Sequence, residues 1–125
     1  MKTYRININP VSKPRMVHSD KWKKRPATSK YWGFKDELIA KCNVAGLNDL
    51  PTHIESIDFY IPMPESWSNK KKDEMNNKDH EQKPDLDNLL KSLQDCLCKS
   101  DQHISFIGRL SKSWAYMGLI EIEIK

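Results

Sequence analysis

Four stretches of the chain alternate apolar and polar residues, which is the two-residue period of a strand with one buried face. They are Thr3–Asn9, Ile57–Ile61, Ile104–Leu110 and Tyr116–Ile124. Residues 111–115 are expected to form the connection between the last two. The pattern therefore predicts a small sheet of four strands.

Apolar residues spaced by three and four predict two longer helices. The first spans Ser29–Ala45 and ends at Gly46, because glycine favours the left-handed conformation that often follows a helix. The second carries one apolar face made of five leucines, at positions 86, 89, 90, 93 and 97. Between them we expect a short polar helix, capped by Ser66 and reaching about Met75. Strands and helices mixed along 125 residues predict a single α+β domain over residues 1–125.

The stretch Lys83–Lys91 places two carboxylates, those of Asp85 and Asp87, at the start of the second long helix. A helix start tolerates negative charge and aspartate is a good N-cap, but one cap needs one aspartate. A second carboxylate adds repulsion, which a hard divalent cation with oxygen ligands would relieve. The alternative is that both acids are only caps and solvated charge. Lys91 has its own alternative, because it lies four residues after Asp87, the spacing of an ordinary ion pair on a helix surface.

A third acid, Asp101, opens the strand that is predicted directly after this helix. A strand that packs back along the helix could return Asp101 to the end that carries Asp85 and Asp87. Mg²⁺ binds through a few carboxylates together with substrate phosphate, so such a cluster suits metal-assisted phosphodiester chemistry. A zinc site is disfavoured, because the cysteines form no Cys-x-x-Cys pair.

Basic residues are concentrated in the first part of the chain, although the net charge is only +4. Residues 1–35 contain ten of the 21 lysines and arginines but only one of the 17 acids. Aromatic residues are interleaved with them, which suits a polyanion with stackable bases, namely nucleic acid. We expect DNA contacts from this segment and weaker ones from the short helix; the alternative for both is solvated surface charge. The aromatic residues are Trp22, Tyr31, Trp32 and Phe34, and the basic residues are Arg15, Lys21, Lys23, Lys24 and Arg25 in the segment and Lys70, Lys71 and Lys72 in the short helix.

Three cysteines, Cys42, Cys96 and Cys98, form no even framework of disulfides, which agrees with a reducing compartment. No apolar run approaches membrane-spanning length, and Met1–Asn9 lacks the apolar centre of a signal peptide. The sequence therefore predicts a cytoplasmic protein without a membrane partner.

The nine residues Lys-Pro-Asp-Leu-Asp-Asn-Leu-Leu-Lys at 83–91, followed by Asp95 and by Asp101-Gln102-His103-Ile104, also resemble a known family. They are similar to the motif of the RusA family of Holliday junction resolvases, which are small phage and prophage endonucleases. The resemblance extends to Lys13-Pro14-Arg15, to the segment at 64–68 and to the final isoleucine-rich strand, so it covers nearly the whole chain.

The resemblance implies roles for individual residues. Asp85 and Asp87 match the two metal-binding acids of the family motif, Asp101 matches the third, and Lys91 matches the lysine required for cleavage. The family usually has a longer insertion and a paired Asp-Asp before the third strand. Here Asp101 is placed by its distance from Ile104.

Together, the residues and the resemblance predict a RusA-like α+β domain with a mixed sheet and packed helices. The expected activity is the Mg²⁺-dependent resolution of four-way junctions in branched DNA by paired, symmetric nicks. Because a four-way junction is two-fold symmetric, we expect a homodimer that presents one site to each of two opposed strands. The alternative is a non-catalytic DNA-binding module in which the acids are only caps.

Overall fold

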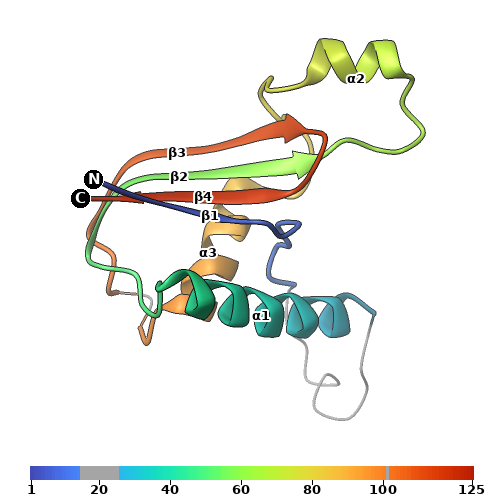
Figure 1. Ribbon diagram of the computed structural model, residues 1–125. Helices are drawn as coiled ribbons and strands as arrows, with labels where there is room; N and C mark the ends of the chain where they lie inside the picture. The colour runs from blue at the N-terminus through green and yellow to red at the C-terminus, as the bar shows by residue number, and fades with distance from the viewer. Residues whose placement is uncertain (15–25, 101) are drawn as a thin grey trace.

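The computed structural model describes residues 1–14, 26–100 and 102–125 (Figure 1). These residues form four strands and three helices, which confirms the predicted α+β class. In chain order, the elements are β1 (Lys2–Ile6), α1 (Pro26–Ala45), β2 (His53–Pro62), α2 (Asn69–Met75), α3 (Leu86–Leu97), β3 (Phe106–Ala115) and β4 (Leu119–Ile124).

The four strands form one mixed sheet in the order β1-β4-β2-β3. β4 pairs antiparallel with both β1 and β2, so that Ile122 lies opposite Tyr4 and Ile57. β2 and β3 pair in parallel, with Ile57 opposite Leu110. Parallel neighbours need a long crossover connection, and here that crossover contains α2 and α3. The predicted acidic motif lies on this crossover.

Helices α1 and α3 lie on one side of the sheet, as Figure 1 shows. The hydrophobic core fills the space between the sheet and these helices. Burial of each leucine or isoleucine there contributes about 1.5–3 kcal/mol. The leucine face of α3 therefore fixes this helix on the sheet and leaves its other side for solvent. Fully buried core residues include Leu38, Ile57, Leu89, Leu93 and Ile122, each at most 1% exposed.

The opposite face of the sheet is polar. Arg5 on β1 donates a hydrogen bond of 2.8 Å to Glu121 on β4. Arg109 on β3 donates two hydrogen bonds, of 2.7 and 3.2 Å, to Asp58 on β2. Ser111 donates a third bond, of 2.5 Å, to the same carboxylate. Asp58 is only 4% exposed, so these donors compensate a buried charge in the middle of the sheet.

Helix α1 confirms its predicted core face and its predicted end. Tyr31, Phe34, Leu38 and Cys42 are all buried. Gly46 adopts a φ of 86°, a conformation that side chains with a Cβ rarely adopt, and the chain turns away there. The helix begins earlier than predicted, at a proline, which is tolerated in the first turn because the N–H it lacks would have no intrahelical partner.

The prediction that Ser66 caps the short helix is wrong. Ser68 is the N-cap of α2, and its hydroxyl accepts a hydrogen bond of 3.2 Å from the backbone N–H of Lys71. Ser66 lies instead in the turn that is closed by the bond from the Trp67 N–H to the carbonyl of Pro64, at 3.1 Å. A serine can occupy a turn or a cap, and the local spacing alone did not distinguish them.

The predicted bounds of the last two strands are also wrong. The expected connection at residues 111–115 belongs to β3, where Ser111 pairs with Asp58 and Ser113 pairs with Tyr60 of the parallel neighbour. The connection lies further along, at residues 116–118, and β4 starts at Leu119. The small polar residues of β3 reach the polar face of the sheet, so they lack the apolar alternation on which the prediction relied.

Candidate active site

The acidic motif lies at the exposed start of α3. Leu89 is 1% exposed and packs in the core, whereas Asp85, Asp87 and Lys91 are all exposed. The helix places these residues on its outer side because its leucines occupy the inner side. Two of the predicted metal-binding acids, Asp85 and Asp87, therefore lie on the same solvent-facing side of α3 as the predicted catalytic lysine.

Asp85 occupies the N-cap position of α3 but makes no capping hydrogen bond with its side chain. Its backbone is extended, with φ −70° and ψ 146°, and its carbonyl accepts the first helical bond from the Leu89 N–H at 3.1 Å. Asp87 lies in the first turn. Among the described residues, neither carboxylate has a hydrogen-bond or ion-pair partner. Both carboxylates are therefore available to a ligand.

Lys91 lies one helical turn after Asp87 and is exposed. Its ammonium forms no ion pair with any described carboxylate. The ordinary reading of this spacing, a pair on the helix surface, is not realised in the structure. The role of Lys91 in cleavage stays a prediction.

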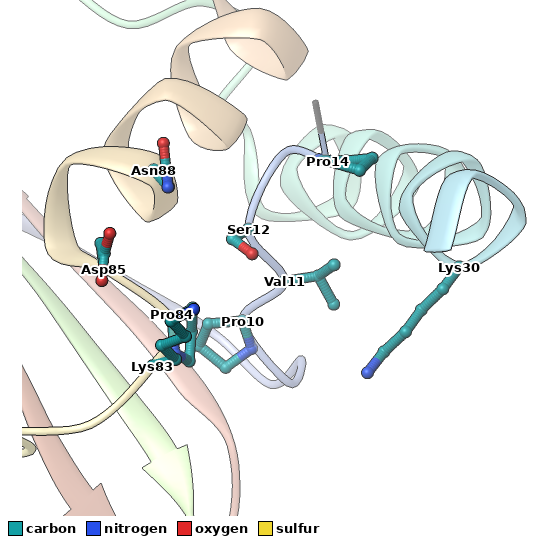
Figure 2. Close-up of a pocket in the computed structure, with 9 residues that line it drawn as sticks. All are labelled: Pro10, Val11, Ser12, Pro14, Lys30, Lys83, Pro84, Asp85 and Asn88. Atoms are coloured by element: carbon teal, nitrogen blue, oxygen red, sulfur yellow. The ribbon is translucent and has the colours of Figure 1, made fainter. Parts of the chain in front are cut away.

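A hollow of about 560 Å³ opens beside Asp85. Figure 2 shows Asp85 and Asn88 on α3 at one side and Lys30 on α1 at the other, with the segment 10–14 running between them. Lys83 also lines the hollow. Lysine side chains bind phosphate as compact positive charges. The hollow thus combines one exposed carboxylate, that of Asp85, with two lysines that a phosphodiester backbone could contact.

The segment that leads into α3 is attached to the outer edge of β3. The N–H of Trp114 donates to the carbonyl of Lys78 at 2.9 Å, and the N–H of His80 donates to the carbonyl of Lys112 at 3.1 Å. The His80 ring packs against Trp114, with the ring centroids 4.2 Å apart. His80 is 3% exposed, and burial together with the nearby ammonium of Lys112 lowers the pKa of its imidazole below the usual value. This histidine is a neutral packing residue.

The residues on either side of Asp101 lie at the other end of α3. Leu97, the last residue of the helix, accepts a hydrogen bond from the Leu50 N–H at 3.3 Å, just before β2. Ser105 donates to the carbonyl of Thr52 at 2.8 Å. The 12 residues of α3 rise about 18 Å between the two ends. Asp101 itself lies outside the described residues, so its part in the site stays a prediction.

Asp95, the alternative third acid, has a partner. The ammonium of Lys13 lies 2.6 Å from its carboxylate, and the two side chains are 32% and 17% exposed. This ion pair ties the segment after β1 to the last turn of α3. Asp95 therefore has a structural role that Asp85 and Asp87 lack.

The predicted basic segment lies outside the described residues at Arg15, Lys21, Lys23, Lys24 and Arg25. Its aromatic companions divide into two kinds. Tyr31 and Phe34 are buried in the core and are not stacking surfaces, which corrects the expectation for these two. Trp32 is 47% exposed, and the ammonium of Lys35 lies 5.3 Å from the centre of its ring. Trp22 lies outside the described residues.

The lysines of α2 lie on a part of the chain that projects away from α1 (Figure 1). Lys70 and Lys71 are exposed, and the Lys71 ammonium lies 4.2 Å from the centre of the Trp67 ring. Trp67 in turn contacts Trp114 of β3, with the centroids 4.8 Å apart. This aromatic contact holds α2 at the end of the sheet. DNA binding by Lys70, Lys71 and Lys72 stays a prediction.

Across the described residues, the structure contains no group of three or more His, Cys, Asp or Glu side chains arranged to hold a metal. Burial raises the pKa of the Cys42 thiol and of the Cys96 thiol to about 11, so both stay protonated at neutral pH. A protonated buried thiol is a poor zinc ligand.

Three residues near the motif were not identified from the sequence as parts of the site. Lys30 on α1 and Asn88 on α3 line the hollow, and Lys112 on β3 contacts the loop before Asp85. Asn88 lies within the nine-residue motif, one helical turn beyond Asp85, which was a usable signal. Lys30 belongs to the basic residues of 1–35 that were expected to contact DNA, whereas the position of Lys112 depends on tertiary packing and gave no signal in the sequence.

Exposed, unpaired carboxylates at a helix start, beside lysines, are compatible with the class of proteins that use a divalent cation to act on phosphodiesters. The chain matches the family described as Endodeoxyribonuclease RusA over residues 7–124. It therefore belongs to the RusA endodeoxyribonuclease family, as the motif at 83–91 indicated, and this family acts on DNA as a nuclease. No curated protein sequence matches the chain significantly. Within the described residues, no helix is long and apolar enough to cross a membrane.

Proposed function

We propose that this protein is a Mg²⁺-dependent endonuclease that resolves four-way DNA junctions by paired, symmetric nicks. The carrying observation is that Asp85 and Asp87 have no partner among the described residues although they begin a well-packed helix. Family membership over residues 7–124 supports the nuclease class. The alternative, a DNA-binding module whose acids are only caps, receives no support from Asp85, because its side chain does not cap the helix.

The residues at the start of α3 fit Mg²⁺. This ion binds through one or two carboxylates, retains several waters and takes oxygen ligands from substrate phosphate. Asp85 and Asp87 supply two exposed carboxylates, and neither forms an ion pair with a cationic side chain of the described residues. The family motif alone supports Asp101 as the third ligand, since the described residues around it lie at the end of α3 opposite Asp85.

The chemistry supplied by a bound Mg²⁺ is neutralisation of the scissile phosphate and activation of water. Lys91, one turn further along α3, would stabilise negative charge on the phosphate or on the leaving oxygen. Lys30 and Lys83, which line the adjacent hollow, would contact neighbouring phosphates and orient the strand. We further propose that the protein is a homodimer, because two symmetric nicks need two sites related by the two-fold axis of the junction.

The test is cleavage of a labelled four-way junction by the wild type and by Asp85→Asn and Asp87→Asn proteins. Each substitution removes a metal-binding charge and keeps the side-chain shape, so cleavage should be lost while junction binding is retained or tightened. Asp49→Asn, at an exposed aspartate remote from the motif in sequence, is the matched control and should cut normally. An Asp85→Asn protein that cuts at the wild-type rate would disprove the metal assignment.

A chelator distinguishes the two candidate functions. A nuclease should bind junctions in chelator and nick them only after Mg²⁺ is restored. A pure binding module should bind equally well in both conditions and never nick. The dimer proposal predicts that the two nicks fall at symmetric positions on opposed strands, and linear duplex should be cut much more slowly.

A further inference from the structure

We propose that Lys112 is a positioning residue for the carboxylates at the start of α3. Its ammonium donates hydrogen bonds to the carbonyls of Gln82, at 2.5 Å, and of Pro84, at 2.8 Å. Pro84 directly precedes Asp85, so the second bond holds the peptide unit from which the first acid of the motif projects. This inference rests on the proposed metal-dependent function of the site.

Lys112 holds the segment 80–84, which leads into α3, through both its backbone and its side chain. Its backbone carbonyl accepts the hydrogen bond from the His80 N–H, at 3.1 Å, while its side chain holds Gln82 and Pro84. One strand residue thereby fixes both ends of the short segment that delivers Asp85. β3 is paired along its length with β2, so Lys112 anchors the segment to the sheet.

A lysine suits this role because its ammonium has three donors and no acceptor. Two of those donors satisfy carbonyls for which no N–H partner within the described chain is found. Bonds from a charged donor are shorter and stronger than bonds between neutral groups. Among the described carboxylates, none forms an ion pair with Lys112, so its charge is directed at the loop.

The loop has few other restraints near Asp85. The Asp85 side chain makes no capping bond, and its backbone carbonyl makes only the ordinary helical bond with the Leu89 N–H. An aspartate that capped its own helix would be held by that helix and would direct its carboxylate inward. Here the carboxylate is free for a ligand, and the restraint comes from Lys112 through the main chain. The arrangement resembles the outer-shell contacts that orient metal ligands elsewhere.

The first experiment measures the loop directly, without metal or DNA. Hydrogen exchange of the His80 and Leu89 amides, which donate to the carbonyls of Lys112 and Asp85, is compared in the wild type and in the Lys112→Met protein, which keeps the apolar stem and removes the side-chain donors. We expect faster exchange at these amides and little change in the rest of the sheet. Lys112→Arg, which can still donate to two carbonyls, should restore most of the protection. Unchanged exchange in Lys112→Met would overturn the positioning role.

The second experiment tests the consequence for the site, using calorimetric titration with Mn²⁺ as the probe and single-turnover junction cleavage. Loss of an outer-shell contact lowers metal affinity or activity by about 10- to 100-fold, so Lys112→Met should weaken both to that extent. Junction binding in chelator should stay close to the wild-type value, since a positioning residue does not contact DNA. Wild-type Mn²⁺ affinity in Lys112→Met would also contradict the proposal.

Lys78→Met is the matched control. Lys78 is exposed, lies on the same segment and contributes only backbone atoms to the contact with β3, so the substitution removes the same charge but none of the loop bonds. It should keep normal exchange and Mn²⁺ affinity. If Lys112→Met does not fold, Lys112→Gln retains one donating amide and should show the same changes at smaller amplitude. If the wild type neither binds Mn²⁺ nor cuts, the proposed function fails, and the exchange experiment still decides the role of Lys112.

Discussion

Asp87 and Lys91 lie one turn apart on the exposed side of α3, and their side chains form no ion pair in the structure as described. The order of acid before base at this spacing is the one that favours a pair on a helix surface. Lys91 therefore extends from a fixed backbone without contributing to the fold through this contact. The structure therefore does not show the surface ion pair that would explain Lys91 without catalysis. Its proposed catalytic role can be tested separately.

Replacement of Lys91 by alanine should change activity and leave stability nearly intact. We expect the free energy of unfolding to change by less than about 0.5 kcal/mol, because Lys91 forms no pair with Asp87 and even a formed surface pair would contribute only that much. Single-turnover cleavage should fall by about 10²- to 10³-fold if Lys91 stabilises charge at the reacting phosphate. Lys125→Ala, at the exposed C-terminal residue, is the control. A lowered melting temperature with normal cleavage would return Lys91 to a structural role.

Asp101 and Asp95 should behave differently when each is replaced by asparagine. Asp101→Asn should abolish cleavage in the same way as Asp85→Asn, as the family motif implies. Asp95→Asn should retain cleavage and lose about 1 kcal/mol of stability, because it breaks the pair with Lys13. Thermal melting and junction cleavage of both proteins measure this. The reverse pattern would place Asp95 in the site instead.

Removal of Arg109 should destabilise the sheet. Asp58 and Arg109 form an ion pair. The Asp58 side chain is 6% exposed, whereas the Arg109 side chain is 62% exposed. Arg109→Ala leaves the buried Asp58 carboxylate with Ser111 as its remaining side-chain donor among the described residues, so the folded state should lose stability. Asp58→Asn should cost less, because it removes the buried charge. Chemical denaturation of the two variants provides the comparison, and an equal or smaller loss in Arg109→Ala would contradict this account.

His80 should give the protein a pH-dependent component of stability. Burial lowers its pKa in the folded state, so the unfolded chain binds a proton at a higher pH than the folded chain does. The stability contributed by neutral His80 is present above the unfolded pKa of about 6.5 and is lost as the pH falls below it. His80→Phe keeps an aromatic ring against Trp114 and should flatten the profile below that pH. Parallel denaturation curves for the two proteins between pH 5 and pH 8 would reveal the difference.

Junction binding should weaken steeply with salt. Each phosphate contact releases counterions, so loss of one contact lowers the slope of log affinity against log salt by about 0.9. Lys30→Ala should do so because Lys30 lines the hollow beside Asp85. Arg15→Ala should do so if the basic segment contacts DNA. Lys70→Ala on the projecting helix should change the slope less, and an equal change would assign α2 a larger part in binding.

The local features of this protein could be predicted from its sequence. The leucine face of α3, the core face of α1 and the end of α1 at Gly46 follow from spacing and from backbone preference, which act over a few neighbouring residues. The nine-residue motif at 83–91 indicated the family through its resemblance to the RusA motif. Local spacing failed where one residue type suits two structures, as with Ser66 and Ser68, and in β3, whose serines face the polar side of the sheet.

Only the tertiary structure decided what the motif residues contact. The sequence could place Asp85 at a helix start, but it could not show that the side chain leaves the cap unmade. Nor could it show that Lys112, 28 residues beyond Pro84, reaches back to the carbonyl before the first acid. That contact exists because the crossover through α3 makes β3 the parallel neighbour of β2 and brings its outer edge against the loop. The pairing of β2 with β3 depends on the packing of the whole chain, so no local pattern of residues predicts it.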